Sequence, residues 1–468
     1  MKNKRRIYSL ENLTEEEVAV CFAKCSRTPD SFEVIAKELT EEKSSRFHEK
    51  WVVGYGHSSV AEHAVVRLAI ENVSLLSVEW IQDNRLVSFT EKSSRYQIYD
   101  KEHYFVPTEI KKDKKMLKLY RQAVESLLDT YEAMIEPLTE FVSKREGEDL
   151  PVSKLRGMVM DQARFLLPAA MLTNLGMTAN TRSWEYAISK WLSSGVDEVV
   201  EIAKEAKAKI KKICPTLVKY ADKNEYLADI YNKSKNLVKG VSKEKVCNRP
   251  VRVVDWDRGA MDKVVATMLY GGGSGDYKQA LSWVKKKDKK WKLAFLKKRL
   301  KERSEHDHLP REFESVFISF DVLSDQGAYY DFKRNRMMTQ IRQDLTIENG
   351  YMVPKMIKDV GMERVYMEAI EKMEEIYRVI KKQYPKSAQY LVTKAHNRRY
   401  LLKMNLRELF YFVRLRARKA GNFAYRRMAM IMLEETKKKY PELMKLFFEE
   451  KELDSRKKIE KEYFWKFK

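Results

Sequence analysis

Cysteine is scarce in this chain, which has four in 468 residues: Cys21, Cys25, Cys214 and Cys247. None forms a Cys-x-x-Cys pair, and the two that lie near each other are four residues apart, on one face of a predicted helix. This pattern argues against a disulfide-stabilised secreted domain and against a zinc site. We therefore expect buried free thiols and no metal site.

Long apolar runs are also missing. No stretch reaches the length of a membrane-spanning helix, about 20 consecutive apolar residues. The basic start, residues 1–6, is not followed by the apolar core of a signal peptide. These absences predict a cytoplasmic protein without a membrane partner.

Charge, in contrast, is abundant. Charged residues make up 34% of the chain, and 91 Lys and Arg against 68 Asp and Glu give a formal net charge of +23. This balance suits an anionic ligand or a nucleic-acid partner, but a surface rich in Lys and Glu is also typical of thermophilic proteins. With 44% hydrophobic residues, the chain is long enough for two or three domains with cores of their own.

The stretch from Glu79 to Tyr96 shows neither helical nor strand periodicity. It is dense in polar side chains that can bind a ligand. These are Asp83, Asn84, Arg85, Ser88, Glu91, Ser93, Arg95 and Tyr96. Two Arg can hold a phosphate through bidentate, charge-assisted hydrogen bonds, while Glu and Ser can read the amide edge of a base. A polar surface loop is the alternative interpretation.

The spacing in this stretch resembles the Arg-His-Arg-x-x-Ser-x-x-x-x-Ser-x-Arg-Tyr signature of flavin-dependent thymidylate synthases. The matching positions are Arg85, Ser88, Ser93, Arg95 and Tyr96, and Glu91 stands where the family has Glu or Gln. The first two positions differ, because Asp83 and Asn84 replace Arg and His. Upstream, the segment from Gly56 to His63 resembles the family's His-x-Ser-x-x-Glu-His segment.

The chain also repeats itself at long range. Arg336 follows Arg85 by 251 residues, and Arg407 follows Arg182 by 225. Offsets of this size indicate the duplication of one domain of roughly 220 residues rather than a short solenoid repeat.

We therefore expect an α+β fold of two tandem homologous domains, residues 1–235 and 236–468, each a small mixed sheet with long helices. Residues 14–24 predict a helix with a capping box, and residues 114–142 predict a long helix from their apolar spacing. Residues 64–72 are short and β-branched, which favours a strand.

The resemblance implies that the first domain binds a deoxyuridine monophosphate. In this reading Arg95 and Arg164 clamp the phosphate and polarise the uracil carbonyls, Ser93 faces the ring and Glu91 orients the sugar. Ser93, Arg95 and Arg164 would be the residues closest to the chemistry.

For the flavin, the resemblance implies residues from both domains. Those of the first domain are His57, which would border the flavin ring, Ser59, Arg85, Asn180 and Arg182. Those of the second domain are Arg334, Asn335, Arg336, Asn405 and Arg407.

The first domain lacks one arginine of the family pattern. Nine residues after Arg182 the family carries another Arg, and Trp191 stands there. The second domain keeps that position as Arg416, which we expect to bind the substrate.

The second domain lacks a different set. Gln389 stands at the position of Arg164, and Arg342, Asp344 and Thr346 stand roughly where the nucleotide loop would have Glu, Ser and Arg. Because each domain keeps what the other has lost, the pattern predicts composite sites built from both.

By this resemblance the reaction is reductive methylation of dUMP at carbon 5, with FAD as cofactor and methylene-tetrahydrofolate and NADPH as cosubstrates. The family is a homotetramer with sites between subunits, so the resemblance implies a homodimer of this chain that acts as a pseudo-tetramer.

Two alternatives stay open. The protein can be a degenerate homologue that binds nucleotides or nucleic acid without turnover, or a flavoenzyme that modifies another pyrimidine or a uracil in RNA. A basic run over residues 285–292 and 297–299, with Trp291 inside it, fits RNA or DNA. The same run also fits a solvated helix face, which we favour over nucleic acid.

Overall fold

The computed structural model describes residues 5–54, 58–147, 149–230, 247–304, 307–448 and 453–467. It divides into two compact units, each described here by itself. Unit 1 comprises Met1–Ser93, His103–Lys112 and Ala170–Glu244, and unit 2 comprises Ser94–Glu102, Asp113–Ala169 and Lys245–Lys468. A helical segment of the first half of the sequence therefore belongs to unit 2. The expected domain boundary at 235/236 lies outside the described residues and stays a prediction.

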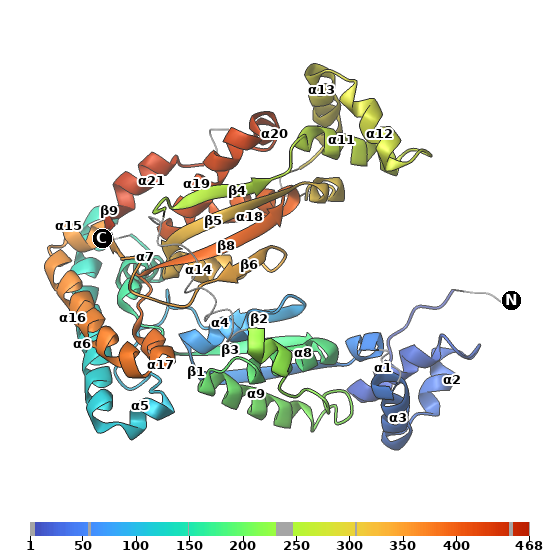
Figure 1. Cartoon of the computed structure of the whole chain (residues 1–468), viewed down its shortest axis with the longest axis horizontal. Coiled ribbons are helices and arrows are strands. Elements are labelled where there is room, and N and C mark those ends of the chain that lie inside the picture. The colour runs from blue at the N-terminus through green and yellow to red at the C-terminus, as the bar shows by residue number, and fades with distance from the viewer. Residues whose placement is uncertain are drawn as a thin grey trace. The chain divides into compact units, whose positions relative to one another are not determined.

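Unit 1 is built on an antiparallel sheet with the strand order β1-β3-β2 (Figure 1). Its strands are β1 (Val65–Ser74), β2 (Val87–Glu91) and β3 (Leu172–Asn180). Its helices are α1 (Glu15–Lys24), α2 (Phe32–Lys37), α3 (Glu41–His48), η1 (Glu49–Gly54), η2 (Ser58–Glu62), α4 (Leu75–Ile81), α5 (Thr108–Lys112), α8 (Thr181–Leu192) and α9 (Asp197–Ile210). Strand β2 lies inside residues 79–96, although the sequence of this stretch shows no strand periodicity.

Polar caps set where the helices of unit 1 begin. Thr14 and Glu17 form the predicted capping box of α1. Asn180 ends β3 and starts α8, because its Oδ1 accepts a hydrogen bond from the backbone N–H of Ser183 at 2.8 Å. The core beneath is apolar, and the indole of Trp191 is fully buried, with its N–H donating to the carbonyl of Trp80 at 3.0 Å.

Unit 2 contains a larger antiparallel sheet with the order β4-β5-β8-β6, and a separate pair of strands, β7 and β9. The strands are β4 (Val251–Trp256), β5 (Phe317–Asp325), β6 (Thr339–Arg342), β7 (Met352–Pro354), β8 (Asn397–Asn405) and β9 (Phe464–Phe467). The helices around the main sheet are α11 (Ala260–Gly271), α12 (Tyr277–Lys285), α13 (Lys289–Leu300), η5 (Arg311–Ser315), α14 (Gln326–Phe332), α18 (Leu406–Arg416), α19 (Phe423–Lys439), α20 (Pro441–Phe447) and α21 (Arg456–Tyr463).

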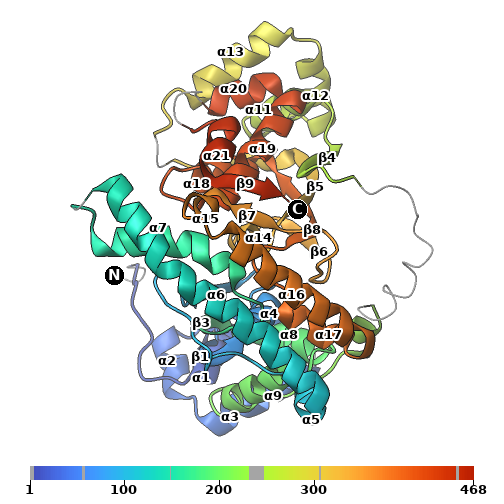
Figure 2. The same ribbon diagram turned by 90° about the vertical axis from the view of Figure 1, so that its left-hand side faces the viewer.

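A layer of long helices completes unit 2. From the first half come α6 (Lys114–Glu146), α7 (Val152–Ala163) and η3 (Arg164–Leu166). From the second half come α15 (Lys355–Asp359), α16 (Glu363–Gln383), α17 (Pro385–Ala388) and η6 (Gln389–Leu391). Helices α6 and α16 lie side by side (Figure 2). They pack through apolar stripes such as Tyr120, Leu127 and Tyr131 on α6 and Tyr366, Met373 and Tyr377 on α16, all buried.

The element order of the first half recurs in the second. The series α1, α2, α3, η2, β1, α4, β2, α6, α7, η3, β3, α8 and α9 is matched by α11, α12, α13, η5, β5, α14, β6, α16, α17, η6, β8, α18 and α19. Local contacts recur too: Arg182 pairs with Glu62 in the first half, and Arg407 pairs with Glu314 at 2.6 Å in the second. The predicted α+β tandem architecture is confirmed.

The two copies of one segment pair directly with each other in unit 2. Pro168 forms an antiparallel bridge with Thr393, its equivalent 225 residues later. The flanking backbone hydrogen bonds run both ways, from Ala169 N to Val392 O (3.0 Å) and from Lys394 N to Leu167 O (3.1 Å). Equivalent residues exchange equivalent bonds, which is the pattern of an isologous, two-fold contact.

The four cysteines are free, as expected. Cys21 and Cys214 are buried, but Cys25 is exposed because α1 ends just before it, so the expectation of burial is wrong there. No helix in the described part of the chain is long and apolar enough to cross a membrane.

Candidate functional site

Two guanidinium groups of the first half share one carboxylate in unit 2. Asp161 lies in the last turn of α7, with Oδ2 2.8 Å from Nη2 of Arg95 and Oδ1 3.2 Å from Nη2 of Arg164. The side chains of Asp161 and Arg164 are each only 10% exposed. A largely buried carboxylate between two cations fixes the orientation of both.

A second group comes from the second half of the sequence. Arg416 ends α18, and its Nη1 lies 3.4 Å from Oδ1 of Asp331 on α14. The same oxygen is 3.8 Å from Nη1 of Arg334. The Arg416 guanidinium also lies over the ring of Tyr425, 5.4 Å from its centroid. Gly421 packs against that ring so closely that a Cβ there would be 2.5 Å from the Tyr425 hydroxyl oxygen.

The two groups meet at Tyr425. Burial raises the pKa of its hydroxyl and so does Asp331, whereas Arg416 and Arg95 both lower it. One phenol therefore lies within electrostatic reach of a guanidinium from each half. The structure thus brings three predicted residues, Arg95, Arg164 and Arg416, into one cluster of unit 2.

Two donors of this cluster are open. Nε of Arg164 and Nε of Arg416 are buried and make no hydrogen bond within the described protein. Leaving a buried charged donor without an acceptor costs roughly 1–3 kcal/mol or more. Three Arg against the two carboxylates of Asp161 and Asp331 leave positive charge in excess. The arrangement suits an anion with several acceptor oxygens, such as a phosphate.

A close contact between the halves lies beside this cluster. Gly327, at the start of α14, faces Phe165 of η3, and a Cβ there would be 2.7 Å from the Phe165 ring. Asp325 caps α14 by accepting a hydrogen bond from the N–H of Ala328 at 2.7 Å. Burial raises the pKa of Asp325 to about 6, although the Ala328 N–H, Arg427 and Arg164 lower it.

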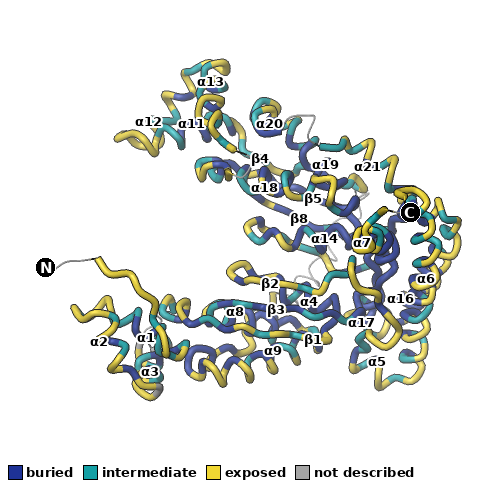
Figure 3. Tube along the Cα trace, turned by 180° about the vertical axis from the view of Figure 1, so that it is seen from behind, coloured by how far each residue is buried: buried dark blue, intermediate teal, exposed yellow. Residues whose placement is uncertain are grey.

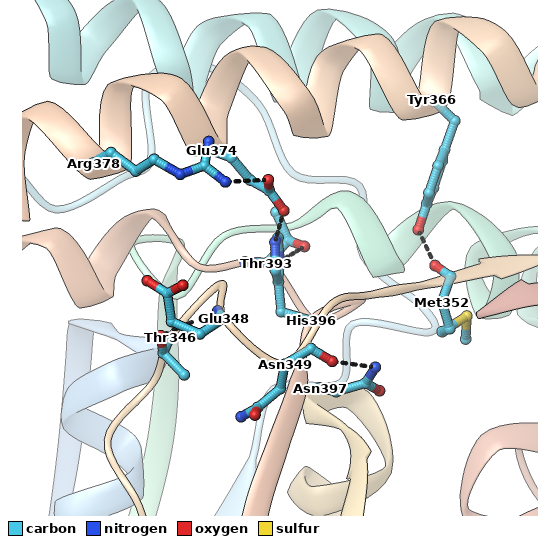
Figure 4. A network of polar contacts seen from close by, with 10 residues as sticks. All are labelled: Thr346, Glu348, Asn349, Met352, Tyr366, Glu374, Arg378, Thr393, His396 and Asn397. Carbon is cyan, nitrogen blue, oxygen red and sulfur yellow. Dashed lines mark hydrogen bonds and ion pairs between the residues drawn. The ribbon is translucent and has the colours of Figure 1, made fainter. Parts of the chain in front are cut away.

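In the second half, the residue at the position equivalent to Arg164 is hydrogen-bonded within the protein. Gln389 occupies the position of Arg164, and its Oε1 accepts a hydrogen bond from the backbone N–H of Leu345 at 3.1 Å. The loop after Leu345 is held in place by two hydrogen bonds (Figure 4). Thr346 Oγ1 accepts from Glu348 N at 3.2 Å, and Asn397 Nδ2 donates to Asn349 O at 3.1 Å. In the second half this loop is therefore hydrogen-bonded to the protein itself, whereas the equivalent region of the first half presents cations.

A buried network near that loop has the order of a catalytic triad. His396 Nδ1 is 2.8 Å from Thr393 Oγ1, and its Nε2 is 3.3 Å from Oε1 of Glu374, which also pairs with Arg378 (Figure 4). Thr393 is 0% exposed and His396 1%. A substrate has no access to a hydroxyl at this depth, so the network serves to hold the start of β8 against α16.

The predicted residues of unit 1 lie as follows. Glu91 ends β2 and accepts a hydrogen bond from Gln82 Nε2 at 2.9 Å, Ser93 is half-buried and Arg85 is exposed. Asp83, which stands in place of the family's first Arg, pairs with Lys190 at 3.4 Å.

The predicted cofactor residues of unit 1 have structural partners where they are described. Asn180 caps α8, and Arg182 forms the ion pair with Glu62. Ser59 is exposed in η2. His57 lies outside the described residues.

In the second half, Arg334 is exposed, Arg336 is half-buried, and the buried Asn335 donates to the carbonyl of Phe332 at 3.2 Å. Asn405 caps α18 by accepting from Glu408 N at 2.8 Å, and Arg407 donates to the carbonyl of Leu309 at 2.7 Å. In each half, the Asn of the Asn-x-Arg motif therefore caps a helix, and the Arg forms an ion pair with a Glu.

Sequence reasoning missed Asp161 and Asp331, and it placed Tyr425 only in a basic stripe with Arg426 and Arg427, for which we expect a ligand phosphate or a subunit interface. Each Asp precedes a predicted Arg by three residues, a spacing that places both on one side of a helix, so pairing offered a signal. Nothing in the local sequence distinguishes Tyr425, because its role depends on Gly421 and on the meeting of the two halves.

Comparison with known proteins identifies the family. The model of the thymidylate synthase complementing protein family matches residues 9–216 and again residues 253–442. The chain belongs to this family. It contains two diverged copies in tandem, and the two matches correspond to the two halves of the element order.

Relatives fall into two lengths. A UPF0159 protein of Chlamydia muridarum is 29% identical over 93% of this chain and 90% of its own length, and one of Thermoplasma acidophilum is 29% identical over 89% and 91%. A flavin-dependent thymidylate synthase of Clostridium tetani is 28% identical over 44% of this chain and 82% of its own length. The two UPF0159 proteins therefore match nearly the whole of this chain, and the flavin-dependent thymidylate synthase matches about half of it.

Asp325 generates a pH prediction. Its pKa of about 6 in the folded protein exceeds the ordinary value of 3.8, so the unfolded state releases this proton first. The stability that the protonated carboxyl contributes is therefore complete below about pH 4 and is lost as pH rises to about 6, by roughly 3 kcal/mol. In urea unfolding, the free energy of unfolding of the wild type should fall by this amount as pH rises, and that of Asp325→Asn should not. The reason is that Asn keeps the helix cap without titrating.

Asp276→Asn, the same change at the exposed N-cap of α12, is the matched control and should keep the wild-type decline. If Asp325→Asn also keeps that decline, the assignment of a raised pKa to Asp325 is wrong.

Proposed function

We propose that this protein is an FAD-dependent enzyme of the thymidylate synthase type, which methylates dUMP reductively at carbon 5 with methylene-tetrahydrofolate and NADPH. The observation that carries the proposal is the cluster of Arg95 and Arg164 from the first half with Arg416 from the second. These are the three arginines that the family resemblance assigns to the nucleotide.

The cluster fits a nucleotide monophosphate. The buried Nε of Arg164 and the buried Nε of Arg416 need acceptors, and a phosphate supplies several at once. Asp161 keeps Arg95 and Arg164 oriented before the ligand arrives, so less entropy is lost on binding. A guanidinium aimed at a uracil carbonyl would also stabilise charge that develops there when carbon 6 is attacked.

Glu91 and Ser93 complete the proposal at the level of the sequence. Glu91 ends β2 and Ser93 follows it, both shortly before Arg95, and the resemblance assigns Glu91 to the sugar and Ser93 to the ring. Both assignments stay predictions.

The cofactor residues that fit best are Arg334 and Arg336. Arg334 is exposed and has only a long contact of 3.8 Å with Asp331 among the ion pairs of the described residues, and Arg336 makes no ion pair with a residue in the described ranges, so both guanidiniums can reach the phosphates of FAD. FAD, when bound and reduced by NADPH, would supply the hydride. The roles of His57, Ser59, Arg85, Asn180, Arg182, Asn335, Asn405 and Arg407 toward the flavin stay predictions.

The proposal assigns one nucleotide site to each chain. A second nucleotide site, built from the complementary positions of the two halves, would need a cation at Gln389 and another at Trp191. The Gln389 amide oxygen instead accepts a hydrogen bond from Leu345, and Trp191 is fully buried in a core. A homodimer would then carry two nucleotide sites among four halves, and this assembly stays a prediction.

Removing either end of the cluster tests the site. Arg95→Ala and Arg416→Ala should each weaken dUMP binding at least tenfold, since each removes charge-assisted hydrogen bonds worth about 1.5–3 kcal/mol. Calorimetric titration with dUMP and with deoxyuridine separates the phosphate from the base. The loss should be large for dUMP and small for the unphosphorylated nucleoside.

Arg121→Ala, on the exposed face of α6, is the matched control and should bind like the wild type. Unchanged dUMP affinity in both cluster variants would remove this site from consideration.

A second measurement addresses the flavin. The purified protein should be yellow or take up added FAD, and the flavin absorbance should bleach when NADPH is added anaerobically. Arg334→Ala combined with Arg336→Ala should lower the bound flavin because two phosphate-binding cations are lost. A colourless protein that binds no added FAD would contradict the proposed reaction while leaving nucleotide binding intact.

A further inference from the structure

The helix α13 differs sharply from its counterpart in the first half. Its twelve residues, Lys-Lys-Trp-Lys-Leu-Ala-Phe-Leu-Lys-Lys-Arg-Leu, include six Lys or Arg and no acid. The equivalent α3 has two Glu with Lys43 and Arg46. The duplication therefore offers an internal comparison, in which one copy of the same element has become strongly basic.

Half of these cations are not used for folding. Lys292 pairs with Asp262 at 2.6 Å and Lys289 with Glu442 at 2.9 Å. Lys290, Lys297 and Lys298 are exposed and form no ion pair with residues in the described ranges. Three unpaired cations on one short helix repel each other in solution and favour a polyanion.

The same helix carries a second apolar stripe that its own packing does not require. Leu293, Leu296 and Leu300 share one side, and Leu296 is fully buried. At about 100° per residue, Trp291 and Phe295 lie on the roughly opposite side. The leucines therefore dock α13 onto the rest of unit 2, and the half-buried aromatic pair lies on the side of the helix away from them.

Those aromatic rings form an array with α12. Trp283 of α12 is 45% exposed and lies edge-on to Trp291, 5.3 Å between centroids. Trp291 stacks on Phe295 at 5.4 Å with 18° between the planes. Lys287 Nζ is 4.2 Å from the centre of the Trp283 ring. Figure 3 draws much of α12 in yellow, as exposed chain.

A pocket of about 380 Å³ adjoins the start of α13. It is lined by Lys289 together with Trp256, Arg258 and Lys439. The guanidinium carbon of Arg258 is 3.6 Å from the Trp256 ring centre, and Lys439 Nζ is 3.8 Å from it. Arg258 and Lys439 form no ion pair with described residues, so the pocket extends the combination of rings and free cations beyond α13.

The geometry points to a binding site for single-stranded nucleic acid on α12 and α13, with the Trp256 pocket at its end. Flat rings beside unpaired cations match unstacked bases joined by phosphates. A membrane surface fits less well, because it requires an aliphatic face turned outward, and the leucines of α13 face the protein. This inference does not depend on the proposed enzymatic reaction.

The test is fluorescence anisotropy with labelled oligo(U) and oligo(dT) of about 20 nucleotides, longer than one such site. Titrations with the full chain between about 50 and 200 mM salt give the affinity and its salt dependence. The charge-reversal variant is Lys290→Glu/Lys297→Glu/Lys298→Glu. We expect at least tenfold weaker binding and a slope of log affinity against log salt that is shallower by about 2, at roughly 0.7 per phosphate contact.

The matched control is Lys204→Glu/Lys209→Glu/Lys211→Glu on α9 of unit 1 and its C-cap, which changes the net charge equally at exposed lysines. It should bind within twofold of the wild type. Trp283→Ala tests stacking without changing charge and should weaken binding about tenfold, whereas Tyr226→Ala, at an exposed aromatic of unit 1, should not.

Comparison of the two oligonucleotides shows whether RNA or DNA is preferred, and either preference supports the site. Three results would overturn it: no binding of either oligonucleotide at low salt, equal weakening by the two triple variants, or binding of anionic lipid vesicles without binding of oligonucleotides. Circular dichroism of each variant confirms that it is folded before the comparison is made.

Discussion

A reciprocal pair of backbone hydrogen bonds joins the two copies of one segment within unit 2, and the candidate site depends on it. Leu167 and Ala169 of the first half exchange bonds with Lys394 and Val392 of the second. Because backbone groups at equivalent positions pair with each other, the contact survives while the surrounding side chains diverge. It places η3, with Arg164, against the start of α14, where Gly327 leaves room for Phe165.

Divergence across this contact is the reason why we propose a single nucleotide site in each chain. Arg164 presents an open donor on one side, and its equivalent Gln389 is bonded to the backbone of Leu345 on the other. A phosphate site that loses one arginine loses about 2 kcal/mol or more, so a half that has lost one is free to lose the rest. Trp191, sealed in the core of unit 1, shows the same process at the position that Arg416 keeps.

Much of this organisation could be predicted from the sequence, because it depends on the spacing between particular residues. The offset between Arg85 and Arg336 indicated the duplication, and polar residues before apolar runs indicated helix starts such as Thr14. What could not be predicted depends on tertiary contacts. The short strand β2 forms only because β3 pairs with it, and the packing of α6 on α16 places first-half helices in unit 2. The carboxylates that orient the arginines had only their three-residue spacing as a signal, and the meeting of the two halves at Tyr425 had none.

The central claim is that each chain holds one nucleotide site, composed of arginines from both halves. Isothermal titration calorimetry with dUMP measures this directly through its stoichiometry. The account predicts one nucleotide per chain, whatever the state of assembly. A value of two per chain would mean that a second site, which includes the position of Gln389, also binds, and a value of zero would mean that the arginine cluster serves the fold and not a ligand.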